Sequence, residues 1–416
     1  MSIILTLTLL STFLQKEDVC TVCGHDSEVM LKGQTISHQP FEIFFQSSSL
    51  DIEEKIGEKD ILWIETEHFR IGSKLESWRI PIKEKKSYLE ELTQLATLFP
   101  GINTQTKKLD PWMRLHLMAW RAENLYEEML TMLGWDEDPF AKLPAENIFI
   151  DASQGDWAEI LKKEWLENEG RQDGLPQWLG LGRYFGMPMK YEILLLEDEK
   201  PFSTLKKEYI GVLDPLPQRW HNSWRPQGMN PVSRSLWYGL STKVDKITHD
   251  QHVHNAILHN TSINILDGYM LYLLEAPMWL RVGIGHYYSK RNDLRFNFYD
   301  LDEGAIEFSQ DAKKWYPLVR KMVSRDSGKG FAKLGQIRNF GDLSFEDHLE
   351  SWSKVDFLYS TQPKSFGKWV RLLKTNQNRT NNLTAQREAL KESFNWTFTQ
   401  ADVAWKAWVK ENKSEQ

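Results

Sequence analysis

Short apolar runs alternate with polar breaks over residues 17–80. The runs are rich in Ile, Phe and Trp and are bounded by Gly, Ser and Asp, which is typical of strands. The predicted strands cover PFEIFF at 40–45, DILWIE at 60–65, HFRIGS at 68–73 and WRIPI at 78–82. The N-terminal part of the chain is therefore expected to be rich in strands.

Two helices are predicted after these strands. The first covers residues 83–98 and is stopped by Pro100-Gly101. The second runs over 111–133, because Asp110 can cap the free amides, Pro111 suits the first helical position, and Gly134 ends the run. Its apolar residues recur at helical spacing and predict a buried face made of Leu115, Met118, Ala119, Ala122, Leu125 and Met129.

The rest of the chain changes from a mixed to a helical pattern. Residues 147–248 contain Gly and Pro throughout and one strong predicted strand, YEILLLE at 191–197. Helices are predicted over 249–275, 303–325, 344–361, 363–374, 384–394 and 399–410, with Thr399 and Asp402 as a capping box for the last. We therefore predict an α+β fold with a strand-rich region at 16–146, a mixed region at 147–248 and a helical region at 249–416.

Composition narrows the class of protein. The 416 residues suggest about two or three domains, and 41% apolar with 26% charged residues is ordinary for a globular protein. A net charge of -7 argues against nucleic acid as a partner, because phosphate binding needs clustered Lys and Arg. The 18 tryptophans are interpreted as core residues, since several recur at helical spacing.

Residues 1–15 contain an apolar stretch, Ile3 to Leu14, with the length of a signal-peptide core. It predicts export to the periplasm or the medium. No Lys or Arg precedes the stretch and no Ala-x-Ala-like site follows it, so a buried N-terminal strand in a cytoplasmic protein is the alternative. No run of eighteen apolar residues occurs, so no integral membrane domain is expected.

The two cysteines, Cys20 and Cys23, form a lone C-x-x-C pair. Such a pair fits a redox couple, half of a zinc knuckle or a local disulfide. A four-ligand zinc site would need His25 and His38 as the other two ligands. A plain turn near the mature N-terminus, closed by a disulfide after export, is the simplest interpretation.

Five of the eleven histidines lie between residues 249 and 291: His249, His252, His254, His259 and His286. On a helix the first two share a face with His259, and His254 points away. Imidazoles on one face could bind a divalent metal. However, seven residues at 1.5 Å each separate His252 from His259 by roughly 10 Å, so one ion cannot take both without a break in the helix.

Residues 249–411, with Pro277-Met278-Trp279-Leu280 and the following Gly283-Ile284-Gly285-His286-Tyr287, resemble the gluzincin-type (peptidase-MA-like) zinc metallopeptidase domain of poorly characterised exported bacterial proteins. In that family an H-E-x-x-H helix and a later Pro-x-Trp-Leu-x-Glu-Gly helix supply three zinc ligands and a general base. The family also places an edge strand beside the substrate cleft, which makes 191–197 the candidate for this strand.

At the catalytic positions this chain departs from the family pattern. His254 stands at the first ligand position, but Asn255 replaces the general base, and Leu258 and Val282 replace the other two ligands. Starting the motif at His259 gives Asn260 and Ile263 at the base and second ligand positions. Since none of these replacements can accept a proton from water or bind zinc, the resemblance implies a non-catalytic protein that binds a peptide or protein segment without a cofactor.

The alternative is a zinc-dependent hydrolase with relocated ligands among His252, His259 and His286, in which His252 or His259 acts together with His286. A second route to an enzyme would use Glu275 or Asp267 as an acid or base. Other chemistry lacks a sequence signature. The chain contains no G-x-x-x-x-G-K-[ST] or G-x-G-x-x-G phosphate loop and no G-x-S-x-G nucleophile elbow.

Overall fold

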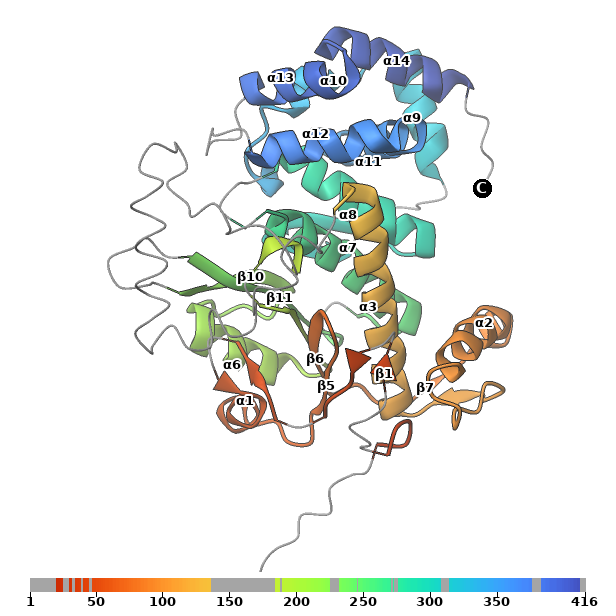
Figure 1. Cartoon of the computed structure of the whole chain (residues 1–416), viewed down its shortest axis with the longest axis vertical. Coiled ribbons are helices and arrows are strands. Elements are labelled where there is room, and N and C mark those ends of the chain that lie inside the picture. The colour runs from red at the N-terminus through yellow and green to blue at the C-terminus, as the bar shows by residue number, and fades with distance from the viewer. Residues whose placement is uncertain are drawn as a thin grey trace, which may run out of the picture.

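The computed structural model describes residues 20–24, 30–31, 34–38, 40–44, 47–135, 184–187, 189–224, 232–244, 246–270, 272, 276–307, 314–375 and 383–411. In space, a mixed sheet lies at one end of the described part of the molecule and a stack of helices lies at the other end (Figure 1). The predicted α+β class is confirmed. The predicted signal segment at 1–15, His25 and Glu275 lie outside the described residues.

The central sheet has five strands in the order β10-β11-β9-β6-β5. They are β5 (Leu62–Glu65), β6 (Phe69–Ser73), β9 (Tyr191–Leu196), β10 (Gln218–Trp224) and β11 (Val232–Ser241). Strands β6, β9 and β11 are parallel, and the two outer strands are antiparallel to their neighbours. The strand predicted at 191–197 exists as β9, but its expected edge position is wrong: an unbroken apolar run favours the sheet interior, and β10 forms the edge in this part of the chain.

Smaller elements surround the sheet. The strands predicted at 40–45 and 78–82 shorten to β3 (Glu42–Ile43), which pairs with β4 (Ser47–Ser48), and β7 (Trp78–Arg79), which pairs with β8 (Lys108–Leu109); β1 (Met30–Leu31) pairs with β2 (Gln34–Thr35). The helices here are α1 (Ser49–Ile56), α2 (Lys85–Ala96) and α6 (Glu199–Ile210), and α1 packs against α6. Short 3₁₀ helices cover Ile82–Glu84, Tyr184–Gly186 and Phe340–Asp342.

Helix α3 (Pro111–Leu133) runs from the sheet to the C-terminal helices (Figure 1). Its bounds match the prediction. The Asp110 side chain accepts a hydrogen bond from the Met113 amide, and Gly134 ends the helix in a left-handed conformation with φ of 57°. The predicted apolar face is buried, and α3 contacts β5, β6 and helices of the C-terminal half.

The C-terminal half consists of helices and one hairpin. The helices are α7 (Asp250–Gly268), α8 (Met278–Asn292), α9 (Trp315–Ser324), α10 (Gly330–Leu334), α11 (Phe345–Thr361), α12 (Pro363–Thr375), α13 (Leu383–Phe394) and α14 (Phe398–Glu411). The hairpin joins β12 (Phe298–Asp302) and β13 (Gly304–Glu307). Helix α7 packs against α8 and β11, and α8 packs against α11.

Two local predictions for this half are wrong. The helix predicted over 303–325 is β13 at its start and α9 at its end. Gly304 lies so close to the Pro217 carbonyl, next to β10, that a side chain there would overlap it, and this tertiary contact favours the hairpin. The last helix is capped by Thr397 and Gln400 rather than Thr399 and Asp402, because Asp402 instead accepts hydrogen bonds from Lys354 and the Phe331 amide.

No helix in the described part of the chain has both the length and the apolar character needed to cross a bilayer. Among the described residues, five tryptophans belong to the largest fully buried side chains, as expected for core residues: Trp237, Trp279, Trp315, Trp369 and Trp405.

Candidate metal centre and the frame between α7 and α8

Among the described residues, one group of ligand-type side chains lies close enough together to hold a metal ion. It consists of Cys20, Cys23, His38 and His116, whose four ligand atoms all lie within 4.8 Å of one another. We call it the Cys2His2 cluster. Cys20 and His116 are buried, and Cys23 and His38 are half-buried. The first three residues precede the sheet in the sequence, whereas His116 lies in the first turns of α3.

The cysteine pair forms a tight turn that presents both sulfurs on one side. The amides of Val22 and Cys23 lie 3.4 and 3.5 Å from the Cys20 sulfur and donate to it. The Gly24 amide donates to the Cys20 carbonyl at 2.9 Å, and Gly24 has a φ of 63°, which a residue without a Cβ adopts easily. The amide donors stabilise negative charge on the Cys20 sulfur.

Backbone carbonyls orient both imidazoles of the cluster. His38 Nδ1 lies 2.7 Å from the Trp63 carbonyl and His116 Nδ1 lies 2.9 Å from the Trp112 carbonyl. A carbonyl can only accept, so each Nδ1 is the donor, and Nε2, which carries the lone pair in this tautomer, faces the cluster. Nε2 of His38 is 3.1 Å from the Cys23 sulfur, and Nε2 of His116 is 3.8 Å from the Cys20 sulfur. These residues could hold a metal ion.

Sequence reasoning named three of these four residues. It paired Cys20 and Cys23 with His38 but named His25 as the fourth ligand, and His116 was missed. His116 lies 96 residues from Cys20, so local spacing carries no signal for it. The one hint in the sequence is a histidine within the apolar surface of the α3 segment.

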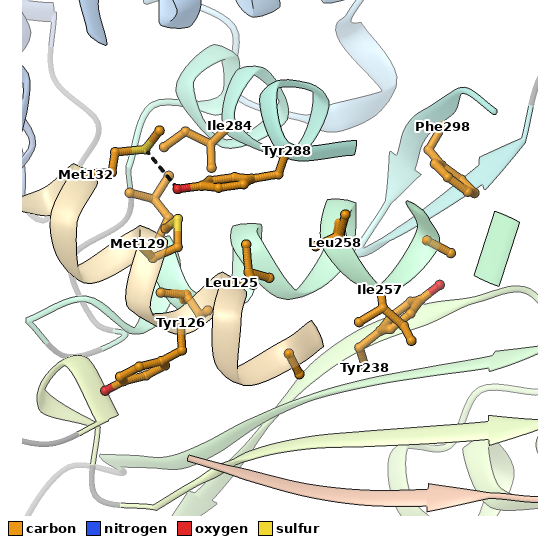
Figure 2. Close-up of a cluster of buried hydrophobic side chains, with 14 of the residues drawn as sticks. Leu125, Tyr126, Met129, Met132, Tyr238, Ile257, Leu258, Ile284, Tyr288 and Phe298 are labelled. Atoms are coloured by element: carbon orange, nitrogen blue, oxygen red, sulfur yellow. Dashed lines mark hydrogen bonds between the residues drawn. The ribbon is translucent and has the colours of Figure 1, made fainter. Parts of the chain in front are cut away.

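The sequence resemblance aligns four residues of α7 and α8 with the gluzincin motif, and we call these four positions the frame between α7 and α8: His254, Asn255, Leu258 and Val282. Asn255 donates from its amide to the carbonyls of Asp293 and Phe296 and accepts from Asn292, so it serves to hold the end of α8. Leu258 lies in an apolar cluster with Leu125, Ile257 and Tyr288 (Figure 2). These two positions of the frame therefore have structural roles.

The other two residues of the frame, Val282 and His254, are also buried in the protein interior. Val282 is fully buried in a small apolar cluster with Met278 and Phe340. His254 is buried beside α3, and burial, followed by the charge of Arg121, lowers its pKa well below the ordinary value, so it is neutral near pH 7.

A buried polar network joins α7 to β12 and the edge strand β10. His259 Nε2 donates to Asp300 at 2.7 Å, and Arg219 Nη1 donates to both Asp300 and Asn260 at 2.6 Å. Burial alone would raise the pKa of Asp300, but the charge of Arg219 and the contact with His259 hold it well below its ordinary range. His259 is therefore hydrogen-bonded to Asp300, and Asp300 also forms an ion pair with Arg219. The sequence analysis did not predict a role for Arg219 or Asp300 in this network.

The remaining candidate histidines lie in different surroundings. His286 shares a 2.9 Å hydrogen bond with His348, and its ring centre is 4.9 Å from that of His259. Burial, then the neighbouring imidazoles, lowers the pKa of His286 well below its ordinary value. His252 stacks on Phe296 with ring centres 4.4 Å apart, and burial lowers its pKa to about 4. Asp267 pairs with Arg281 at 2.5 Å.

A surface cavity of about 260 Å³ opens between α3, α7 and α8. It is lined by Glu91, Trp120, Arg121, Asn124, Leu125, Glu128, His254, Leu258, Tyr288, Arg291 and Asn292. Both signs of charge are present on its wall, together with aromatic and amide groups. We call this cavity the α3–α7–α8 pocket.

Comparison with known proteins gives no assignment: no protein-family model, no characterised protein and no solved structure matches this chain.

Proposed function

We propose that this chain is an exported, non-catalytic protein with a metallopeptidase-like C-terminal region, and that it acts by binding a peptide or protein segment. The observation that carries the proposal is the use of the frame between α7 and α8 for packing. Asn255, Leu258 and Val282 hold neighbouring elements together, and His259 is bound to Asp300. A hydrolase would need these positions to hold a metal and a water.

The α3–α7–α8 pocket is the proposed binding site. Arg291 pairs with Glu128 at 2.8 Å, and both side chains are about half exposed, at 53% and 50%. Such a pair can exchange its partner for a charged group of a ligand at small cost, because exposed ion pairs contribute little. Trp120 adds an aromatic surface. A short peptide with charged side chains and an apolar residue fits this chemistry.

A binding and hydrolysis experiment tests the proposal. Fluorescein-labelled peptide pools of random sequence would be titrated with the purified protein, and the same pools carrying a quencher would report cleavage. We expect saturable binding without cleavage, and weaker binding by Arg291→Ala. The control is Lys368→Ala, which removes a similarly exposed cation, 51% exposed and paired with Glu392, from α12. Cleavage, or equal binding by both variants, contradicts the proposal.

The second candidate is a zinc-dependent hydrolase with ligands among His252, His259 and His286. The closeness of the His259 and His286 rings favours it, together with their Nδ1 atoms, which have no hydrogen-bond partner among the described residues. Peptide cleavage that needs zinc and disappears in both His259→Ala and His286→Ala would establish this candidate in place of the first.

A further inference from the structure

We propose that the Cys2His2 cluster binds one Zn²⁺ ion, and that this ion is structural: it fastens the segment of Cys20–Gly24 to α3 and to the sheet. The proposal is independent of the peptide-binding function, because the cluster shares no residue with the α3–α7–α8 pocket. Four lines of argument support it: the spacing of the ligand atoms, the tautomers of the histidines, the charge balance and the number of ligands.

Two pairs of ligand atoms lie close to the spacing found in a tetrahedral zinc site. Bond lengths of about 2.3 Å to sulfur and 2.05 Å to nitrogen place a sulfur and a nitrogen roughly 3.6 Å apart at the tetrahedral angle. Two of the four sulfur–nitrogen distances, 3.1 Å for Cys23 with His38 and 3.8 Å for Cys20 with His116, lie on either side of this value, and all four ligand atoms lie within 4.8 Å of one another. A shift of a few tenths of an ångström brings both to the ideal.

Both histidines are prepared as ligands by their neighbours. The carbonyls of Trp63 and Trp112 accept the Nδ1 protons, so each Nε2 turns its lone pair towards the cysteine sulfurs, where a metal would bind. Zinc-bound histidines usually have a partner of this kind, which fixes the tautomer and orients the ring. Aromatic packing also holds the imidazole rings. The ring centres of His38 and Trp112 are 4.7 Å apart, those of His116 and Phe99 are 5.3 Å apart, and both pairs pack edge to face.

Charge balance favours a divalent ion at this place. On binding, the two thiols release their protons to solvent and coordinate as thiolates, whose two negative charges cancel those of Zn²⁺. Cys20 and His116 are each only 2% exposed, so a neutral complex is needed there. The amides that donate to the Cys20 sulfur stabilise its thiolate further.

The ligand count indicates a structural role. Two cysteines and two histidines fill all four positions of a tetrahedral ion, which leaves none for water or substrate. The ion would join three places in the chain: the turn at Cys20–Gly24, the segment of His38 next to the bridge between Ser37 and Glu65, and α3. A second contact holds the same turn, since the Thr21 hydroxyl donates to Asp110 at 3.0 Å.

Metal analysis of the untagged full chain, expressed with zinc in the medium and purified without chelator, tests the proposal. We expect one zinc per chain in the wild type, and less than a tenth of that in Cys23→Ser and His116→Asn. The matched control is His221→Gln, which removes a half-buried imidazole from β10 and keeps one zinc per chain. Zinc-free wild-type protein, or one zinc per chain in both ligand variants, overturns the proposal. One copper or iron per chain overturns the choice of metal.

Replacement of the metal by Co²⁺ in the wild-type chain provides a test that does not depend on the folding of variants. Tetrahedral coordination by two thiolates and two imidazoles gives strong visible d–d bands together with sulfur-to-cobalt charge-transfer bands in the near ultraviolet. We expect both, and we expect added Zn²⁺ to remove them. A weak octahedral spectrum without charge-transfer bands means that the thiolates are not ligands and contradicts the proposal.

Discussion

At the scale of single residues, buried carboxylates and their partners determine the surroundings of α7. Asp250, the first residue of α7, is fully buried and accepts hydrogen bonds from Tyr88, Arg114 and Arg121. Asp300 accepts from Arg219 and His259 in the same way. Each carboxylate ties α7 to elements distant in the sequence, so both residues contribute to tertiary structure.

Replacing Asp300 by Asn should destabilise the fold by about 3–5 kcal/mol, because it leaves the buried Arg219 guanidinium without its counter-charge. Urea unfolding followed by tryptophan fluorescence measures this loss. Asp302→Asn is the control, since Asp302 is exposed on the same strand and should change stability by less than about 0.5 kcal/mol. Equal stability of the two variants would show that the network is dispensable.

The lowered pKa of Asp250 should make the stability of the fold depend on pH. Burial opposes its charge, but Arg121 and Arg114 outweigh burial and lower its pKa from 3.8 to about 2. The folded state therefore binds this proton more weakly than the unfolded state, so the stabilisation is complete above about pH 4 and is lost as the pH falls towards 2. It amounts to about 2 kcal/mol. Between pH 6 and pH 2.5, the free energy of unfolding should fall more steeply with decreasing pH for the wild type than for Asp250→Asn. An equal pH dependence of the two proteins would show that the pKa of Asp250 is not lowered in the folded state.

At the scale of elements, local sequence signals predicted α3, β5, β6 and most C-terminal helices, because caps and apolar periodicity are properties of neighbouring residues. The elements that were missed depend on distant contacts. The β12–β13 hairpin, which was missed, forms where Gly304 meets Pro217. Strand β9 was predicted, but its interior position was not, because that position depends on the flanking strands β6 and β11. Neither relation can be read from a single segment.

Close packing of α8 on α11 depends on Gly283. A Cβ at this position would lie 2.7 Å from both the Ser351 carbonyl oxygen and Val355 Cγ2. In an exposed helix the change from Gly to Ala stabilises by about 1 kcal/mol, whereas here Gly283→Ala should lower the free energy of unfolding by about 1–3 kcal/mol through overpacking. Gly101→Ala is the control, because nothing lies within 4 Å of its Cβ position. Thermal unfolding compares the stability of the Gly283→Ala and Gly101→Ala variants. A Gly283→Ala protein more stable than the wild type would refute the close approach of α8 to α11 at Gly283.

The candidate metal centre shows the same limit of sequence reasoning. The spacing of Cys20 and Cys23 identifies a ligand pair, and His38 is near enough in sequence to be considered with it. His116 becomes a neighbour only once α3 has packed beside the cysteine turn. The ion pairs around His259 were missed for the same reason, since Arg219 and Asp300 lie on separate strands.

At the scale of the whole molecule, α3 connects the parts. Its first turns carry His116, its middle lines the α3–α7–α8 pocket, and α12 packs against it (Figure 1). A metal at the Cys2His2 cluster would fix the start of this helix. Because α3 contacts both the sheet and the C-terminal helices, a metal ion in the Cys2His2 cluster would stabilise both parts.

Removal of the metal should lower the melting temperature of the whole chain. A ligand that binds only the folded state contributes to stability, and this contribution disappears on chelation. We expect incubation with a strong zinc chelator to lower the transition in differential scanning calorimetry by at least about 5 °C, and added zinc to restore it. The Cys20→Ser/Cys23→Ser protein should melt at the lower temperature with or without chelator. A wild-type transition that does not respond to chelator would contradict a structural ion.

The central claim is that the metal of this chain belongs to the N-terminal cluster and that the frame between α7 and α8 has none. Zinc content of the Cys20→Ser/Cys23→Ser protein, measured by plasma mass spectrometry beside the wild type, tests it most directly. The account predicts about one zinc per wild-type chain and none in the double variant. One zinc per chain in the double variant would place the ion among the C-terminal histidines and contradict the account.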